Sequence, residues 1–380
     1  MGDLADSRVD LAVVGAGIVG LAHALHAVDR GLRVAVVERD ASPVGASVRN
    51  FGHGYVEAQS GEALEYGRAA RGLWLRVAAE AGFWASETGT VLVARLPEEL
   101  AVVEEFARAR GSAARVLTAG EVLARAPVSP EGLLGGLWTP GDIRVDPRAA
   151  VPRLADWLEE RGVAFHWRTA ALAAEPGRLA TGRGELEADA IVLAAGHDLD
   201  LLAPEVAASA GLRLCTLQML RVGGPAGRRI EPCIATGLAL LRYSGFRSCP
   251  SHVTLRERYL GERPELVELG VNLLIAQQPD GDLILGDTHR YGAMSDPFRD
   301  EAADDLLLHE GARLLGVDRL EVRERWLGAY AHAPGREFLV ATPAERVRAV
   351  AVTSGIGMTT ALGLAERVLD ELFEHASATV

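Results

Sequence analysis

The chain has 380 residues, of which 49% are hydrophobic and 24% are charged, and its formal net charge is −13. This length and composition are typical of a globular protein with about two or three domains and a sizeable core. The negative charge argues against nucleic-acid binding, no run of about 18 apolar residues predicts a membrane span, and the first strand comes too early for a signal peptide, so we expect a cytoplasmic protein.

Residues 9–40 predict the first part of a nucleotide-binding fold. An apolar strand leads into the glycines of a G-x-G-x-x-G motif and a helix, and a second strand ends at Glu38. Gly15 allows a tight turn, Gly17 allows a pyrophosphate to approach, and Gly20 lets the helix pack on the strand. The helix N-terminus attracts the pyrophosphate, and Glu38 accepts hydrogen bonds from ribose hydroxyls. This order predicts a bound dinucleotide and leaves both FAD and NAD open.

The remaining elements follow from apolar spacing and from Gly and Pro punctuation. We expect strands at 9–14, 33–37, 89–94, 165–169, 190–194 and 349–353. We expect helices at 61–81, 97–108, 119–126, 147–161 and 300–315, and a last helix that ends at about residue 374. Residues 212–290 predict a mostly β segment with a hairpin at 279–282. Loop 41–61 is too long for an idle connector, which predicts a functional role.

These motifs resemble the D-amino-acid oxidase superfamily of FAD enzymes, which includes glycine oxidases and sarcosine oxidases. The resemblance covers nearly the whole chain, and it rests on the N-terminal motif, ASVRNFG at 46–52, and the segments 142–163, 188–196, 269–287, 326–335 and 351–368. The segments SVRNFG and SGIGMTTALGLAE are most similar to those of a subgroup of flavin oxidoreductases whose genes are often found beside phosphonate-degradation genes. The resemblance implies oxidation of a small-molecule amine: a hydride moves from the carbon next to nitrogen to flavin N5, and the imine is hydrolysed.

The predicted fold is therefore of the α/β class. A Rossmann-type FAD-binding domain is interrupted by a β-rich substrate domain with a mixed sheet and helices. We assign residues 1–85, 142–212 and 325–380 to the FAD-binding domain, and residues 86–141 and 213–324 to the substrate-binding domain.

FAD is expected to lie between two glycine turns from opposite ends of the chain. The second turn, Gly355-x-Gly357, offers another helix N-terminus to the flavin edge where negative charge develops. The residues that we expect to bind FAD are Gly15, Ala16, Gly17, Ile18, Gly20, Glu38, Arg39, Ser47, Arg49, Asn50, Phe51, Gly52, Ala171, Ala194, Ala195, Gly196, Gly328, Gly355, Ile356, Gly357, Met358 and Thr359.

The cofactor is expected to be noncovalent. Some relatives link flavin to a histidine where this chain has Arg49, and sarcosine oxidases link it to a cysteine in the C-terminal third. The last of the three cysteines here is Cys249. These cysteines show neither CxxC nor zinc-type spacing, so we expect no disulfide and no metal site.

Six residues are predicted to face the substrate: His53, Tyr243, His289, Arg290, Tyr330 and His332. The loop that enters the active site in relatives carries His53 and Tyr55. Tyr243 matches a region where glycine oxidase-like enzymes place a tyrosine over the substrate. His289 and Arg290 end a strand where they would bind an anion. A solvent-facing histidine and ordinary strand residues remain the alternatives.

Two departures from the family pattern affect the expected chemistry. Relatives carry an arginine in a C-terminal G-x-R turn that holds the substrate carboxylate, but here the turn reads GAYAH at 328–332. Tyr330 and His332 would instead contact a phosphonate, a larger amine, or a carboxylate held from another side. Sarcosine oxidases use a lysine for reaction with O2, and this chain has no lysine. We favour O2 as the electron acceptor and keep a dehydrogenase as the alternative.

Two further functions stay open. An NAD(P)H-linked flavin reductase or hydroxylase needs a second nucleotide fingerprint, which the sequence after residue 40 does not show. A flavin-binding subunit of a larger complex is the other alternative, and the sequence leaves the oligomeric state undetermined.

Overall fold

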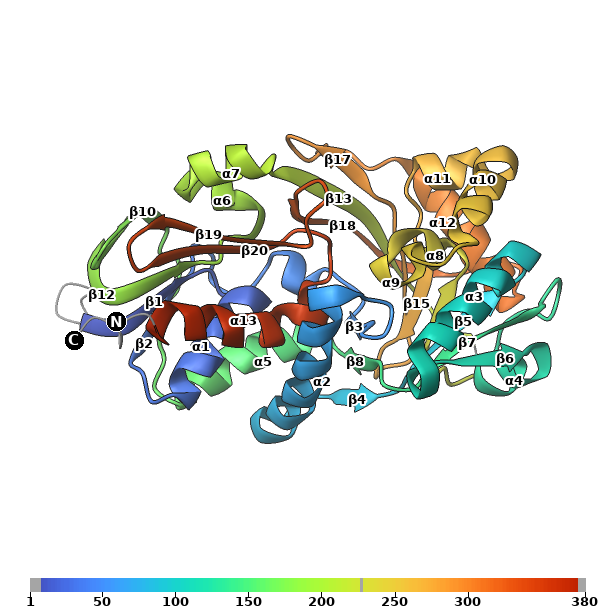
Figure 1. Cartoon of the computed structure of the whole chain (residues 1–380), viewed down its shortest axis with the longest axis horizontal. Helices are drawn as coiled ribbons and strands as arrows, with labels where there is room; N and C mark the ends of the chain where they lie inside the picture. Colours follow the sequence, from blue (N-terminus) through green and yellow to red (C-terminus); the bar gives the residue numbers. More distant parts are fainter. Residues whose placement is uncertain (1–7, 226–227, 375–380) are drawn as a thin grey trace.

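The structure, a computed structural model, describes residues 8–225 and 228–374. Two large sheets occupy the two halves of the molecule in Figure 1, and a three-stranded sheet lies between them. The small sheet consists of β3 (His53–Gly54), β8 (Ile143–Val145) and β4 (Ala85–Glu87). In the described ranges, no helix combines the length and the apolar character needed to cross a bilayer.

The first large sheet is parallel at its centre. Its strands are β1 (Arg8–Val14), β2 (Val34–Val37), β9 (Ala164–His166), β10 (Ala171–Glu175), β11 (Arg178–Thr181), β12 (Gly184–Leu193), β19 (Phe338–Ala344) and β20 (Val347–Val352). The parallel strands lie in the order β20, β12, β1, β2, β9. Successive β1 residues point to opposite faces: Leu11 and Val13 join one apolar cluster, Ala12 and Val14 another. Both faces of β1 are covered, which explains its nearly continuous apolar sequence.

Helices from distant parts of the chain cover one face of this sheet. They are α1 (Ile18–Asp29), α2 (Gly61–Ala81), α5 (Pro147–Glu160) and α13 (Gly357–Glu374). Figure 1 shows the C-terminal α13 beside α1. The Trp74 indole of α2 donates to the Met358 carbonyl at 2.8 Å, and His26 Nε2 lies 2.7 Å from the Leu362 carbonyl. The two ends of the chain therefore share one core.

The second large sheet is mostly antiparallel. Its strands are β5 (Thr90–Ala94), β6 (Arg115–Thr118), β7 (Gly135–Thr139), β13 (Arg213–Val222), β14 (Cys233–Thr236), β15 (Leu274–Gln277), β16 (Leu283–Gly286), β17 (Arg290–Gly292) and β18 (Val322–His332). The remaining helices are α3 (Pro97–Arg110), α4 (Ala119–Arg125), α6 (Leu199–Leu202), α7 (Pro204–Ala210), α8 (Leu238–Arg242), α9 (Ser244–Arg247), α10 (His252–Glu262), α11 (Pro264–Glu268) and α12 (Glu301–Leu315). Three short 3-10 turns are η2 (Ala46–Val48), η3 (Gly111–Ala113) and η4 (Gly196–Asp198).

The structure confirms the predicted α/β class, with a Rossmann-type parallel sheet and a second, β-rich sheet. The hairpin predicted at 279–282 joins β15 to β16. Two predictions are wrong. The segment 212–290 contains four helices, α8 to α11. In α10 the buried residues Leu255 and Tyr259 lie four positions apart, a helical spacing that the overall composition does not reveal. The predicted turn at 328–332 lies inside strand β18, which pairs with β13 along its length. The boundaries between the two domains stay a prediction.

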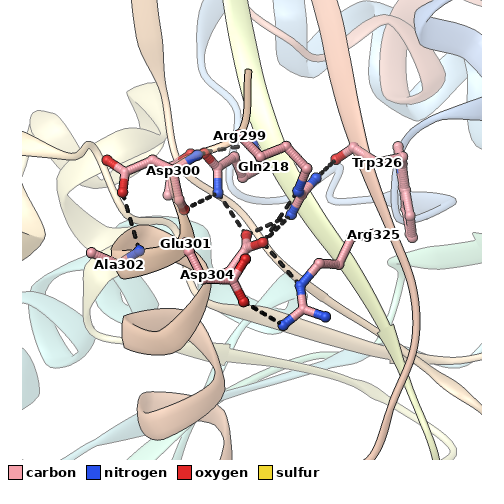
Figure 2. Close-up of polar contacts among 9 residues, drawn as sticks. Gln218, Arg299, Asp300, Glu301, Ala302, Asp304, Arg325 and Trp326 are labelled. Carbon is pink, nitrogen blue, oxygen red and sulfur yellow. Dashed lines mark hydrogen bonds and ion pairs between the residues drawn. The ribbon is translucent and has the colours of Figure 1, made fainter. Parts of the chain in front are cut away.

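A buried carboxylate fixes α12 to the second sheet. Asp304 is fully buried and accepts hydrogen bonds from Arg299 Nη2 at 2.5 Å, from Arg325 Nε at 3.1 Å and from Gln218 Nε2 at 2.6 Å (Figure 2). Arg299 in turn donates to the Trp326 carbonyl at 2.5 Å. These contacts join α12, β13, β18 and the loop that precedes α12, so the loop has a fixed position on the sheet.

We predict that Asp304→Ala lowers the free energy of unfolding by about 3 kcal/mol, because Arg299 and Arg325 lose their shared buried carboxylate. Urea denaturation followed by tryptophan fluorescence measures the change. Asp305→Ala, an exposed position on the same helix, is the matched control and is expected to change stability little. Equal stability of both variants would contradict the role of Asp304.

Candidate active site

A cavity of about 860 Å³ lies where the two large sheets meet. Its walls come from both ends of the chain and from both sheets: the β1–α1 turn, the loop 43–51, the end of β12, the end of α8, strand β18 and the turn before α13. This volume falls in the range of pockets that hold ligands and cofactors. The cavity is therefore the candidate site.

The first glycine turn forms one wall of the cavity. Gly15 has a φ of 102°, which favours glycine, and a Cβ atom built on it would lie 2.5 Å from the Ala194 carbonyl oxygen. A Cβ on Gly20 would overlap the Gly15 carbonyl, which explains the close packing of α1 on the turn. At Gly17 a Cβ would meet only Ser47 Oγ, at 3.2 Å. This turn therefore presents bare backbone to the cavity.

The Glu38 carboxylate is held at the end of β2 by the backbone. It accepts a hydrogen bond from Ala16 N at 2.8 Å and another from Asp40 N at 2.9 Å. The Ser47 hydroxyl accepts from Ile18 N at 2.8 Å and so covers the first turn of α1. Both side chains line the cavity, where they would meet the ribose and pyrophosphate of a dinucleotide.

The second glycine turn lies beside Tyr330 and Arg242 on the cavity wall. Gly355 has a φ of 77°, and a Cβ built on it would lie 3.0 Å from Tyr330 Cζ and 3.1 Å from Arg242 Nη2. Only a glycine lets the turn approach these two side chains so closely. Helix α13 begins two residues later, at Gly357, so its N-terminus also faces the cavity.

Arg242, at the end of α8, is the cation beside this turn. Its Nη2 donates to Tyr330 Oη at 2.8 Å and to the Ser354 carbonyl at 3.0 Å. Burial alone would lower the pKa of this guanidinium, but attraction by Tyr330, Tyr291, Tyr243 and Asp287 raises its pKa above the ordinary value. The side chain therefore carries a fixed positive charge that lines the cavity.

Aromatic side chains surround this cation. His53 stacks on Tyr55 with ring centroids 4.7 Å apart, and Tyr55 meets Tyr243 edge-on at 5.0 Å. Burial, with a smaller effect of Arg144, lowers the pKa of His53 to about 3, so His53 is neutral. Its Nε2 lies 2.8 Å from Thr90 Oγ1. Burial also raises the pKa of Tyr243 to about 12. These groups supply shape and neutral hydrogen bonds rather than charge.

The structure brings most predicted residues to this cavity. Of the substrate-side predictions, His53, Tyr243, His289 and Tyr330 line it. Arg290 does not, because it is exposed and forms an ion pair with Asp300 at 2.5 Å. His332 is also outside the lining set, and its Nδ1 lies 3.2 Å from the Thr353 carbonyl. Of the cofactor-side predictions, those outside the lining set are Ala16, Gly20 and Gly52, which support the turns from behind.

The polar residues of the cavity wall that sequence reasoning missed include Arg242, Asn272, Asp287 and Ser295. Arg242 precedes the predicted Tyr243, and Asp287 precedes the predicted His289 by two residues. In a chain whose 39 basic residues are all arginine, no local signal marks one arginine as buried. The local sequence therefore does not show which of these side chains the fold places on the cavity wall.

Comparisons with known proteins agree with this architecture. The model of a family described as DAO, FAD dependent oxidoreductase, matches residues 10–371. Glycine oxidase from Geobacillus kaustophilus has a similar structure, with a TM-score of 0.79, 21% sequence identity, and coverage of 97% of this chain and 95% of that chain. L-proline dehydrogenase from P. horikoshii has a TM-score of 0.78 and 18% sequence identity, and the match covers 97% of this chain and 94% of that chain. L-α-glycerophosphate oxidase from Mycoplasma pneumoniae, with FAD bound, has a TM-score of 0.74 and 18% sequence identity, and the match covers 96% of this chain and 95% of that chain.

The residues present fit FAD, the cofactor of this family. The bare turn at Gly15 and Gly17 would receive the pyrophosphate, and the Glu38 carboxylate would receive the ribose hydroxyls. The cavity continues from this turn to the Gly355 turn, the N-terminus of α13 and Arg242. FAD is therefore expected to lie with its adenosine end at β2 and its ring at the junction of the sheets.

We predict that Gly15→Ala lowers both the FAD content and the melting temperature of the purified protein, because the new methyl group collides with the Ala194 carbonyl at a positive φ. The flavin-to-protein absorbance ratio and a thermal melt measure the two effects. Gly31→Ala is the matched control: Gly31 also has a positive φ, of 76°, but a Cβ there meets nothing within 4 Å. A variant at Gly15 that keeps full FAD content would refute the assigned pyrophosphate turn.

Proposed function

This chain belongs to the DAO family of FAD dependent oxidoreductases, and we propose that it oxidises an amine that carries an anionic group. FAD held by the two glycine turns would supply a hydride acceptor for the carbon next to the amine nitrogen, and water would hydrolyse the imine product. The observation that carries this proposal is the fixed charge of Arg242 in the same cavity as the two glycine turns.

Arg242 replaces the missing arginine of the C-terminal segment. Its side chain comes from α8, and its contact with Tyr330 Oη at 2.8 Å places the charge beside the strand in which the usual residue is absent. A guanidinium in a largely buried site binds a carboxylate or a phosphonate through charge-assisted hydrogen bonds. Tyr330 and Tyr243 line the cavity with it. The anionic group is therefore held from another side than in the family pattern.

The anion is proposed to be a carboxylate or a phosphonate. The SVRNFG and SGIGMTTALGLAE segments, which resemble the phosphonate-associated subgroup, both contribute residues to the cavity wall, among them Arg49 and Gly357. We therefore propose primary and N-methylated amino acids and 2-aminoethylphosphonates as the substrates to test. Anaerobic mixing of each with the holoenzyme is expected to bleach the flavin absorbance. A holoenzyme that no amine in this set bleaches would refute the proposal.

We also propose that O2 reoxidises the noncovalent cofactor. Positive charge favours the anionic products of O2 reduction, and in this lysine-free chain Arg49 and Arg242 supply it on the cavity wall. The cysteines Cys215, Cys233 and Cys249 are buried and lie outside the lining set, which supports a noncovalent flavin. Readmitted air is expected to restore the flavin absorbance, and acid is expected to release the flavin. Recovery only with an artificial acceptor would indicate a dehydrogenase, and turnover only with a companion chain would indicate a subunit.

We predict that Arg242→Met lowers kcat/KM for the best anionic amine by about 100-fold, because about 3 kcal/mol of charge-assisted binding is lost. The corresponding amide, which lacks the anion, is expected to lose little. Stopped-flow measurement of anaerobic bleaching checks both values. Arg290→Met removes an exposed guanidinium outside the cavity and serves as the control. An equal loss for the acid and the amide would contradict an anion site at Arg242.

A further inference from the structure

A second group of polar atoms lies in the cavity beside the proposed anion site. Asn272 and Asp287 exchange both backbone hydrogen bonds, at 2.8 and 2.9 Å, so their side chains lie on the same face. The two residues are 2% and 5% exposed. Yet Asn272 Oδ1 and Asp287 Oδ1 have no hydrogen-bond partner among the described residues. A buried polar atom without a hydrogen-bond partner destabilises the fold, so a ligand that donates hydrogen bonds is expected here.

His289 adds a third acceptor to this group. Its Nδ1 lies 2.8 Å from the Gly270 carbonyl, which can only accept, so Nδ1 carries the hydrogen. Burial and the charge of Arg242 hold the pKa of His289 well below its ordinary value, so the ring is neutral and Nε2 is an acceptor. The side chains of Asn272, Asp287 and His289 all line the cavity. This part of the wall therefore fits a group with several N–H bonds.

A second buried carboxyl in the molecule shows what is special about Asp287. Burial raises the pKa of both Asp142 and Asp287 to about 7. Asp142 accepts hydrogen bonds from the Thr139 hydroxyl and from Glu57 N, and it lies outside the cavity wall. Asp287 keeps one oxygen without a partner, and it lies on the wall with Arg242. Of these two carboxyls, Asp287 is therefore the one placed to act on a ligand in the cavity.

We propose that Asp287 binds the ammonium group of the substrate and accepts one of its protons. This assignment rests on the function proposed above, in which Arg242 holds the anionic group of the same molecule. One N–H bond of the ammonium breaks and one O–H bond forms at Asp287 Oδ1. The nitrogen keeps the bonding electron pair, so a neutral amine results and nothing is oxidised in this step. The amine is then ready for loss of hydride from its neighbouring carbon.

The charges around Asp287 suit it to this exchange. The groups that act on it are Arg242 from α8, the adjacent Tyr243, the Asn272 side chain, Cys215 from β13, and His289, whose Nδ1 is 3.8 Å from Asp287 Oδ1. Burial raises its pKa to about 7, and Arg242 limits that rise. As the pH rises through this range, Asp287 ionises and attracts an ammonium group. Affinity for an ammonium ligand therefore increases with pH, and affinity for an anion without an ammonium does not.

Two ligands that cannot be oxidised test the proposal. 2-Aminoisobutyrate has an ammonium and a carboxylate but no hydrogen on the carbon between them, and pivalate has a methyl group in place of the ammonium. Binding to the holoenzyme is followed by the change in flavin absorbance. For the wild-type chain, 2-aminoisobutyrate is expected to bind up to about tenfold more tightly as the pH rises from about 6 to about 8, and pivalate is not. Absence of this difference would overturn the proposal without any variant.

The variant Asp287→Asn adds an independent measurement. It keeps the shape of the side chain and removes its charge and basicity, so it is expected to lose about tenfold or more of the affinity for 2-aminoisobutyrate at pH 8 and to keep its affinity for pivalate. In this variant, the pH at which the bleaching rate rises is expected to move toward the pKa of the free amine. Asp296→Asn removes an exposed carboxylate from the same cavity wall and is the matched control.

The outcomes distinguish a failure of the Asp287 assignment from a failure of the proposed anionic-amine function. Equal affinity of wild type and Asp287→Asn for 2-aminoisobutyrate would overturn the role of Asp287 and leave the anionic-amine function intact. A wild-type holoenzyme that binds neither ligand would overturn that function, and the assignment of Asp287 with it. Equal losses in Asp287→Asn and Asp296→Asn would show a general effect of charge on the cavity and would also overturn the assignment.

Discussion

The arrangement of this molecule depends on one guanidinium that needs partners away from bulk water. Arg242 donates from a single nitrogen to Tyr330 on β18 and to the Ser354 carbonyl before α13. A charge that is partly withdrawn from water is stabilised where polar groups surround it, and α8, β18 and the turn before α13 meet at this point. The second sheet, the first sheet and the C-terminal helix thus share one electrostatic contact, and the cavity lies beside it.

Glycine and small residues allow the contact to form. Gly355 lies so close to Tyr330 and Arg242 that a larger residue would displace them, and Gly15 approaches the Ala194 carbonyl in the same way. Both positions have a positive φ, at which glycine is favoured. The network of Asp304 and Arg299 holds Trp326, and the Trp326 indole donates to the Arg49 carbonyl at 3.2 Å. The loop that faces the cofactor side is therefore positioned from the far side of β18.

Sequence reasoning succeeded where structure is local and failed where it depends on distant partners. The first turn, α1, α5 and α13 follow from spacing within one segment, because the glycine, proline and apolar positions that define them are neighbours in the chain. The segment 328–332 was mistaken for a turn because its strand character comes from pairing with β13, more distant in the sequence. Arg242 and Asp287 belong to different segments whose meeting is set by the second sheet. The burial that gives both their chemistry is a property of the whole fold.

The absence of lysine constrains how protons move in this site. An arginine side chain keeps its proton at any ordinary pH, so Arg242 can hold an anion but can neither give nor take a proton. His53 and His289 have pKa values lowered by burial, which makes them poor proton acceptors. Burial has the opposite effect on a carboxyl, and it raises the pKa of Asp287 to about 7, where both protonation states are accessible. The same low-polarity surroundings that keep these two histidines neutral therefore make the Asp287 carboxyl better suited than they are to proton exchange.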